Sequence, residues 1–135
     1  MKTLLVLEDE PHIMVLLCRI LNQYTIIEAV TAEEALLLFI DLGHQVDLLV
    51  ADLTLPRMSG AQVALHLRSR LPDLPVILTS GYPVGVWKDR DCRDLEKLGS
   101  HSVTILQKPF RAEVIRNAVW DLIGDPLADK ATTAN

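Results

Sequence analysis

Cysteine is scarce in this chain of 135 residues, and the two that occur, Cys18 and Cys92, are not spaced like metal ligands. We therefore expect free thiols in a reducing, cytoplasmic environment. Long apolar runs are also missing. None approaches the roughly 20 residues of a membrane span, and the run over 4–7 is too short for a signal-peptide core. These absences predict a protein that neither spans a membrane nor depends on disulfides.

An excess of basic residues is absent as well. The 13 lysines and arginines are outnumbered by 18 acidic residues, which gives a net charge of -5. Without a basic stripe, a nucleic-acid partner is not expected. The length suits one domain, since domains cluster near roughly 100–150 residues. We expect that domain over 1–124, because residues 125–135 are small and polar without periodicity and suit a disordered C-terminal tail.

The chain does contain a regular alternation of short apolar runs and helical patterns. Five segments are too short for helices or rich in β-branched residues, and they lack strict alternation with polar residues. Such runs are typical of strands that are buried on both faces of a sheet. The predicted strands cover 4–7, 25–29, 48–51, 76–79 and 103–106.

Helix signals fill the intervals between these strands. Pro11 can open the first helix, and Thr31 with Glu34 makes a capping-box pattern for a second helix that ends near Gly43. Further helices are expected over 60–70, 89–98 and 110–123. This (βα)5 order predicts an α/β fold, a doubly wound parallel sheet with helices on both faces.

Chemically active side chains stand at the ends of four predicted strands. Glu8 and Asp9 follow the first strand, Asp52 the third, Ser80 the fourth and Lys108 the fifth. Open α/β sheets bind ligands beyond the carboxyl ends of their strands, so these groups would share one crevice. Clustered carboxylates favour Mg²⁺, a lysine can stabilise a phosphoryl group, and a carboxylate can form an aspartyl-phosphate. Each group alone is usually a solvated loop residue, but their joint occurrence indicates a site.

Four ordered motifs carry a resemblance to a known family. They are Leu5-Val6-Leu7-Glu8-Asp9-Glu10-Pro11, then Val50-Ala51-Asp52-Leu53-Thr54-Leu55-Pro56 with Met58-Ser59-Gly60, then Pro75-Val76-Ile77-Leu78-Thr79-Ser80-Gly81, and finally Lys108-Pro109-Phe110. From about residue 3 to 123 the chain resembles the receiver domain of two-component response regulators. The resemblance implies a flavodoxin-like sheet with the strand order 2-1-3-4-5.

The resemblance also implies the roles of the acidic residues. Asp52 takes the place of the phosphorylated aspartate. Glu8 and Asp9 match the acidic pair of a Mg²⁺ site, which the Asp52 carboxylate and the backbone carbonyl of Thr54 would complete. The resemblance therefore implies that a partner histidine kinase or phosphotransfer protein phosphorylates Asp52. The chain would catalyse this transfer and a slow dephosphorylation on itself, without being an enzyme that acts on a separate substrate.

The same resemblance implies two further site residues, and the chain differs from the family pattern in two places. Ser80 matches the switch hydroxyl of the family, and Lys108 matches its phosphate-binding lysine. Ile105, however, stands where the family often has tyrosine or phenylalanine, and the stretch between Ser80 and Lys108 is longer than usual. Without an aromatic ring at Ile105, we expect the signal to rely on Ser80 and on the loop over 81–88, whose glycines allow movement.

Output is expected through protein contacts. Trp87 lies in the long loop, and Trp120 lies off the apolar stripe of the last helix. The face formed by the segments 89–98, 103–106 and 110–123 is therefore the candidate surface for a downstream protein target or a homodimer. Alternatively, both tryptophans cover the core. The competing function is a phosphorylation-independent interaction module with a receiver fold, supported only by Ile105. A Mg²⁺-dependent hydrolase lacks any signal for a substrate pocket.

Overall fold

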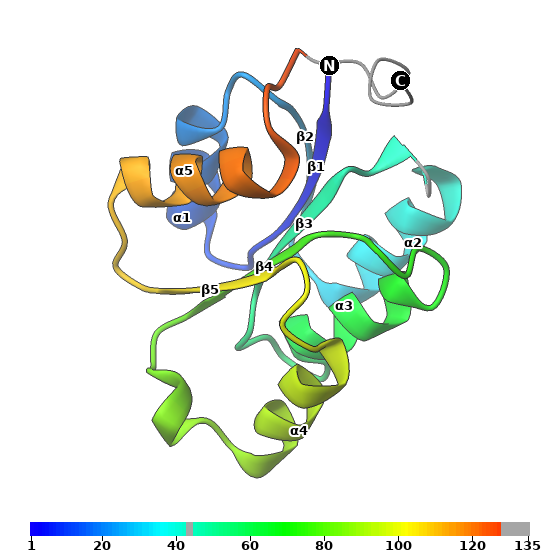
Figure 1. Ribbon diagram of the computed structural model, residues 1–135, viewed down its shortest axis with the longest axis vertical. Helices are drawn as coiled ribbons and strands as arrows, with labels where there is room; N and C mark the ends of the chain where they lie inside the picture. The colour runs from blue at the N-terminus through cyan, green and yellow to red at the C-terminus, as the bar shows by residue number, and fades with distance from the viewer. Residues whose placement is uncertain (43–44, 128–135) are drawn as a thin grey trace.

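The five predicted strands form one parallel sheet (Figure 1) in the computed structural model, which describes residues 1–42 and 45–127. The strands lie in the order β2-β1-β3-β4-β5, which confirms the flavodoxin-like arrangement. All neighbouring pairs are parallel. Their bounds are Thr3–Leu7 for β1, Thr25–Ala29 for β2, Leu48–Asp52 for β3, Val76–Ser80 for β4 and Val103–Gln107 for β5.

Helices cover both faces of this sheet, as the alternating pattern predicts. Figure 1 shows α1 and α5 on one face and α2, α3 and α4 on the other. A short 3-10 helix, η2, lies in the long loop before α4. The bounds are Pro11–Ile20 for α1, Ala32–Leu42 for α2, Gly60–Arg68 for α3, Val84–Val86 for η2, Asp89–Leu98 for α4 and Ala112–Ile123 for α5.

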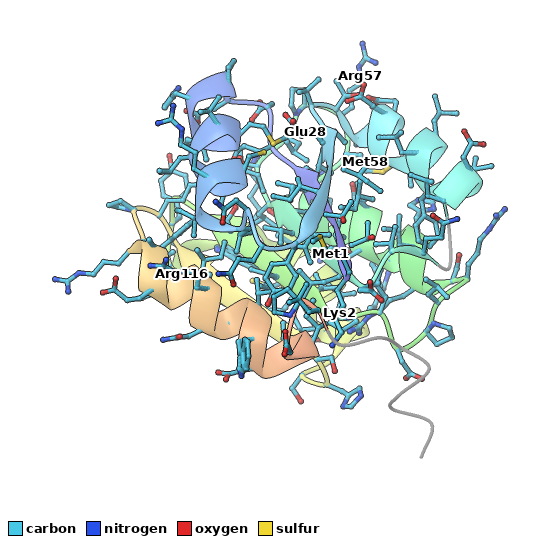
Figure 2. All side chains as sticks on the ribbon, turned by 90° about the horizontal axis from the view of Figure 1, so that it is seen from above. Met1, Lys2, Glu28, Arg57, Met58 and Arg116 are labelled. Atoms are coloured by element: carbon cyan, nitrogen blue, oxygen red, sulfur yellow. The ribbon has the colours of Figure 1, made fainter. Side chains whose placement is uncertain are left out.

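The apolar runs supply two cores, one on each side of the sheet. Successive side chains of a strand point to opposite faces. In β1, Leu4 and Val6 therefore pack with α1 and α5, whereas Leu5 and Leu7 pack with α2 and α3. All four side chains are buried. Figure 2, which looks at the molecule from above, shows side chains filling the space between sheet and helices. Burial on both faces explains why these strands lack polar alternation.

Two helix boundaries differ from the sequence prediction. Helix α5 begins at Ala112 rather than at 110, because Arg111 has an extended backbone and acts as the N-cap residue. Helix α3 ends at Arg68 rather than at 70. There Ser69 is the C-cap residue, and its hydroxyl donates to the carbonyl of His66. Neither shift moves a strand end, so neither affects the crevice at the carboxyl edge.

The capping box predicted for α2 is only half formed. The Thr31 hydroxyl accepts from the backbone N–H of Glu34 at 3.0 Å, as expected. The Glu34 carboxylate accepts from the backbone N–H of Val30 at 2.8 Å, one residue before the expected donor. The helix is described as far as Leu42, and the predicted stop at Gly43 lies outside the described residues.

The residues just before β1 and β2 are hydrogen-bonded to the segment that follows α5. The backbone N–H of Lys2 donates to the carbonyl of Pro126 at 2.8 Å, and the Tyr24 hydroxyl donates to that of Gly124 at 3.0 Å. Of the tail expected over 125–135, residues 128–135 lie outside the described part of the chain. Within the described ranges, no helix is long and apolar enough to cross a membrane.

Candidate functional site

Three carboxylates meet at the carboxyl edge of the sheet. Glu8 and Asp9 follow β1, and Asp52 ends β3. These strands are adjacent and in register, with Leu7 opposite Ala51, so Glu8 and Asp52 are brought to the same level. One carboxylate oxygen from each of the three acids lies within 4.8 Å of the others. Glu8 and Asp52 are buried, whereas Asp9 is exposed. The convergence expected from the sequence is therefore present.

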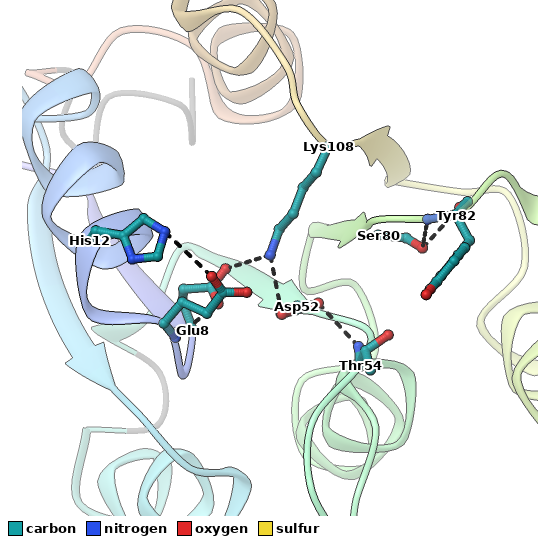
Figure 3. A network of polar contacts seen from close by, with 8 residues as sticks. Glu8, His12, Asp52, Thr54, Ser80, Tyr82 and Lys108 are labelled. Carbon is teal, nitrogen blue, oxygen red and sulfur yellow. Dashed lines mark hydrogen bonds and ion pairs between the residues drawn. The ribbon is translucent and has the colours of Figure 1, made fainter.

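Lys108 joins the two buried acids. Its Nζ lies 2.9 Å from Oε1 of Glu8 and 3.2 Å from Oδ2 of Asp52 (Figure 3). Burial raises the pKa of Glu8, and the charge of Asp52 raises it further, against the opposing hydrogen bond from Lys108. Burial alone would lower the pKa of Lys108, but its contacts with Glu8 and Asp52 outweigh this and raise it. Lys108 is therefore a cation at neutral pH.

The Asp52 carboxylate is held from two sides. Its Oδ2 contacts Lys108, and its Oδ1 accepts from the backbone N–H of Thr54 at 3.0 Å. These partners fix the orientation of the carboxylate at the mouth of the crevice. The donor set of the site consists of oxygens, which are the ligands that Mg²⁺ prefers. The residues present thus fit a hard divalent cation held by Glu8, Asp9 and Asp52.

Gly60 gives the site a close backbone contact that the sequence analysis did not identify. A Cβ atom at Gly60 would lie 2.3 Å from the carbonyl oxygen of Asp52 and 2.9 Å from its carbonyl carbon. The backbone N–H of Gly60 donates to the carbonyl of Leu53 at 3.1 Å. Ser59 caps α3, since its hydroxyl accepts from the backbone N–H of Gln62. The start of α3 therefore rests directly on the backbone of Asp52, and only glycine leaves room for it.

Ser80 is fully buried at the end of β4, and its hydroxyl engages the loop that follows. It donates to the carbonyl of Tyr82 at 2.9 Å and accepts from the backbone N–H of Tyr82 at 3.0 Å. The indole N–H of Trp87 donates to the same carbonyl at 3.1 Å. Tyr82 therefore links Ser80 to Trp87. No sequence signal marked Tyr82, because the link runs through its backbone.

A cavity of about 410 Å³ opens beside these groups, between the loops after β3 and β4. Thr54, whose backbone N–H donates to Asp52, and Ser80 are among the residues that line it. The other residues that line it are Leu53, Leu55, Tyr82, Val86, Trp87, Lys88, Arg90 and Asp91. The long loop thus encloses space next to the acidic cluster. Because Ser80 is part of the cavity wall, a movement of its side chain would change the shape of the cavity.

Comparison with known proteins gives the family. The sequence model of one family, the response regulator receiver domain, matches residues 4–120 of this chain. The chain belongs to this family. Receiver domains are signalling modules of two-component systems.

Two relatives and one solved structure show the extent of the similarity. The sensor kinase CckA of Brucella abortus is 32% identical over 123 residues, which cover 90% of this chain and 12% of that protein. The response regulator GtcR of Aneurinibacillus migulanus is 35% identical over 111 residues, covering 81% of this chain and 42% of GtcR. A receiver domain protein from Clostridium thermocellum superposes with a TM-score of 0.77 at 22% identity, covering 91% and 94% of the two chains. The chain thus spans less than half the length of these curated relatives.

The two tryptophans of this receiver domain differ in how far they are exposed to solvent. Trp87 is buried, with 8% of its surface exposed, and packs in the core shared by α2, α3 and α4. It is therefore a core residue in this conformation and not an exposed anchor. Trp120 is 54% exposed on α5, as the helical periodicity predicts. Ile105 is half-buried and faces an apolar groove between α4 and β5.

The first two helices of this receiver domain are not fully buried. Helices α1 and α2 are apolar almost all round in sequence, a pattern that suits either a buried helix or a subunit interface. More than half of the surface of Val15 and Leu16 on α1, and of Leu37 and Ile40 on α2, is exposed. These helices therefore present apolar side chains to the surface as well as to the core.

Proposed function

We propose that this receiver domain, over 1–124, accepts a phosphoryl group on Asp52 from a histidine kinase or phosphotransfer protein and signals through protein contacts. One observation carries the proposal. Asp52 is buried beside Glu8 and Asp9, is paired with Lys108, and sits at the carboxyl edge of the sheet. This constellation brings a nucleophile, a cation-binding cluster and a fixed ammonium group together.

The transfer follows from these positions. A carboxylate oxygen of Asp52 attacks the phosphorus of the donor, the bond from phosphorus to the donor atom breaks, and the leaving group takes the electron pair. Lys108 lies close enough to the acceptor to contact a phosphoryl oxygen and to balance its charge. Mg²⁺, held by Glu8, Asp9, Asp52 and the backbone carbonyl of Thr54, would supply further charge neutralisation at the phosphoryl oxygens.

Covalent labelling tests this function. The whole chain is incubated with acetyl phosphate and Mg²⁺, and its intact mass is followed with time. We expect a gain of one phosphoryl group that is lost in acid or base, and no gain when EDTA removes the cation. An unchanged mass in the presence of Mg²⁺ would exclude acceptance from this donor and favour the interaction module that works without phosphate.

Magnesium is expected to stabilise the folded chain. Binding to the native state alone raises stability by mass action, and a tenfold excess over the dissociation constant should raise Tm by about 4–6 °C. The Asp9→Ala variant removes an exposed ligand without breaking the Lys108 pairs, so its Tm should respond far less. Asp121→Ala, an exposed acid on α5, is the matched control and should respond like the wild type. Equal shifts in all three proteins would refute this metal site.

We expect the signal to pass from Ser80 to Trp87 through the Tyr82 carbonyl. If the Ser80 hydroxyl turns to a phosphoryl oxygen, Tyr82 loses both bonds to it, and the surroundings of the Trp87 indole change. In the Trp120→Phe variant, beryllofluoride with Mg²⁺, which mimics a phosphoryl group, should shift the emission of Trp87. Adding Ser80→Ala should remove the shift.

Trp120, isolated in the Trp87→Phe variant, reports on the outer face of α5 in the same experiment. A response from neither tryptophan would rule out this route.

For the output itself, we propose the face made by α4, β5 and α5 as the contact surface for a target protein or a second copy. The exposed Trp120 ring and the half-buried β5 support this choice.

A further inference from the structure

The cavity of about 410 Å³ beside the acceptor site has the size and the lining of a small-molecule site. Pockets for small ligands measure roughly 300–1,000 Å³ and combine apolar and aromatic walls with a few polar groups. The loop after β3 gives this cavity apolar side chains, and the segment from the end of β4 to the first turn of α4 adds aromatic rings and a carboxylate. These residues are Leu53, Leu55, Tyr82, Val86, Trp87 and Asp91. The proposed phosphoryl transfer assigns no ligand to this space.

Asp91 is the charged residue of the lining that is buried, with 8% of its surface exposed. Its Oδ1 lies 3.5 Å from a guanidinium nitrogen of Arg90, at the limit of a hydrogen bond, and the Arg90 side chain is half exposed. An ionised carboxylate can accept about four hydrogen bonds, so Asp91 keeps acceptor capacity for a molecule in the cavity. Burying a carboxylate with so weak a partner costs free energy, and a charged donor in the cavity would recover it.

Trp87 gives the cavity an aromatic wall close to this carboxylate. Its indole N–H already donates to the carbonyl of Tyr82 at 3.1 Å, so the ring offers the cavity its carbon surface. Like Asp91, Trp87 is buried. The face of an indole ring attracts a positive charge, and a carboxylate accepts charge-assisted hydrogen bonds from an ammonium or guanidinium group. A ring and a carboxylate in one cavity therefore favour an organic cation.

Two basic residues, Lys88 and Arg90, also line the cavity and raise the alternative of an anionic ligand. Both are exposed, so water and salt screen their charges. Asp91 is largely removed from water, and its charge therefore acts more strongly inside the cavity. A metal ion is a further alternative. Among the described residues, however, the acids placed to share a metal are those of the cluster at the ends of β1 and β3, and Asp91 is not one of them.

We infer that this cavity is a binding site for a small organic cation. The ammonium or guanidinium group of the ligand pairs with the Asp91 carboxylate, and a flat apolar body packs against Trp87. Arylalkylamines are the simplest molecules of this class. The site goes beyond the proposed function and does not depend on it, because contacts within the free protein form the cavity.

Titration of the whole ¹⁵N-labelled chain with phenethylammonium, followed by NMR, tests the site. Mg²⁺ is present throughout, so that it competes for the acidic cluster. Amide signals of 53–55 and 80–91 should shift together with a Kd of about 1 mM. Phenylacetate and phenethyl alcohol have a similar shape but are anionic and neutral, and they should bind at least about tenfold more weakly.

Two results of this titration would overturn the inference. If phenylacetate binds as tightly as the amine or more tightly, the exposed basic residues decide the ligand and Asp91 does not. If the shifts induced by the amine centre on Glu8 and Asp9, or if none occur up to about 20 mM, the cavity is not a site for this class of ligand. The three probes are compared on the wild type, so the result does not depend on the folding of any variant.

The Asp91→Asn variant tests the proposed charge partner, with Asp89→Asn as the matched control. Both substitutions remove one negative charge from the first turn of α4, but Asp89 is exposed and does not line the cavity. Asp91→Asn should weaken the binding of phenethylammonium at least about tenfold, and Asp89→Asn less than about twofold. Circular dichroism checks the fold of both. Equal affinities of a folded Asp91→Asn variant and the wild type would refute the pairing with Asp91.

Discussion

The Asp52→Asn variant is expected to lose all phosphoryl labelling while it keeps its fold. Asparagine has no anionic oxygen to attack phosphorus, so the yield with acetyl phosphate should fall more than ~100-fold. The fold should survive because the asparagine side-chain oxygen can still accept from the Thr54 N–H, and Lys108 retains its bond to Glu8. Intact mass after timed incubation measures the loss, and circular dichroism checks the fold.

Asp121→Asn supplies the control for this experiment, because it removes an exposed carboxylate far from the crevice along the chain. Its labelling should match the wild type in rate and extent. Stoichiometric labelling of Asp52→Asn would show that another side chain accepts the phosphoryl group, and peptide mapping would then locate it. Glu8 is the nearest buried candidate, since its carboxylate shares Lys108 with Asp52.

A methyl group at Gly60 is expected to damage both the fold and the acceptor site. In Gly60→Ala the new Cβ would lie 2.3 Å from the backbone oxygen of Asp52, which real Cβ atoms essentially never approach so closely. Relief requires α3 or the end of β3 to shift, at a cost of roughly 3 kcal/mol. Because alanine is the better helix former, intrinsic propensity alone would predict the opposite sign.

Urea unfolding and acetyl phosphate labelling measure the two consequences of Gly60→Ala. Any shift of the Asp52 backbone displaces its carboxylate from Lys108. The rate of phosphoryl labelling should therefore fall together with the free energy of unfolding. Gly85→Ala is the control, because no atom lies within 4 Å of its added Cβ. It should change stability by about 0.5 kcal/mol at most. Equal unfolding free energies for the two variants would mean that the contact at Gly60 is relaxed in solution.

Local sequence patterns predicted most of the secondary structure. Strand β2 has its predicted bounds, and the other strands each extend by one residue at one end. These segments form strands because their apolar residues are buried on both faces, a property that short windows of sequence express directly. Errors concentrated at helix ends such as Arg111, where the backbone turns from extended to helical without a strong capping residue.

For the candidate site, the sequence predicted which residues lie at the strand ends but not which hydrogen bonds and close contacts they make. Parallel neighbouring strands bring Glu8 and Asp52 together once the strand order is known, and the motifs implied that order. The sequence could not show that the Ser80 hydroxyl bonds to Tyr82, because hydroxyl direction depends on the course of the following loop. Nor could it show the contact of Gly60 with Asp52, which depends on how closely α3 approaches β3.

The order of strands and helices, the residues at the carboxyl edge and the family were determined by the sequence alone, because they depend on periodicity, spacing and motifs. Tertiary structure decided which polar side chains are buried. Asp94 lies in a charge-rich helix, yet it is buried, and that helix packs against α3. Trp87 lies in a loop without periodicity, yet it is buried in the core, and its indole N–H donates to the carbonyl of Tyr82. Burial is set by segments distant in the chain, and no local window contains them.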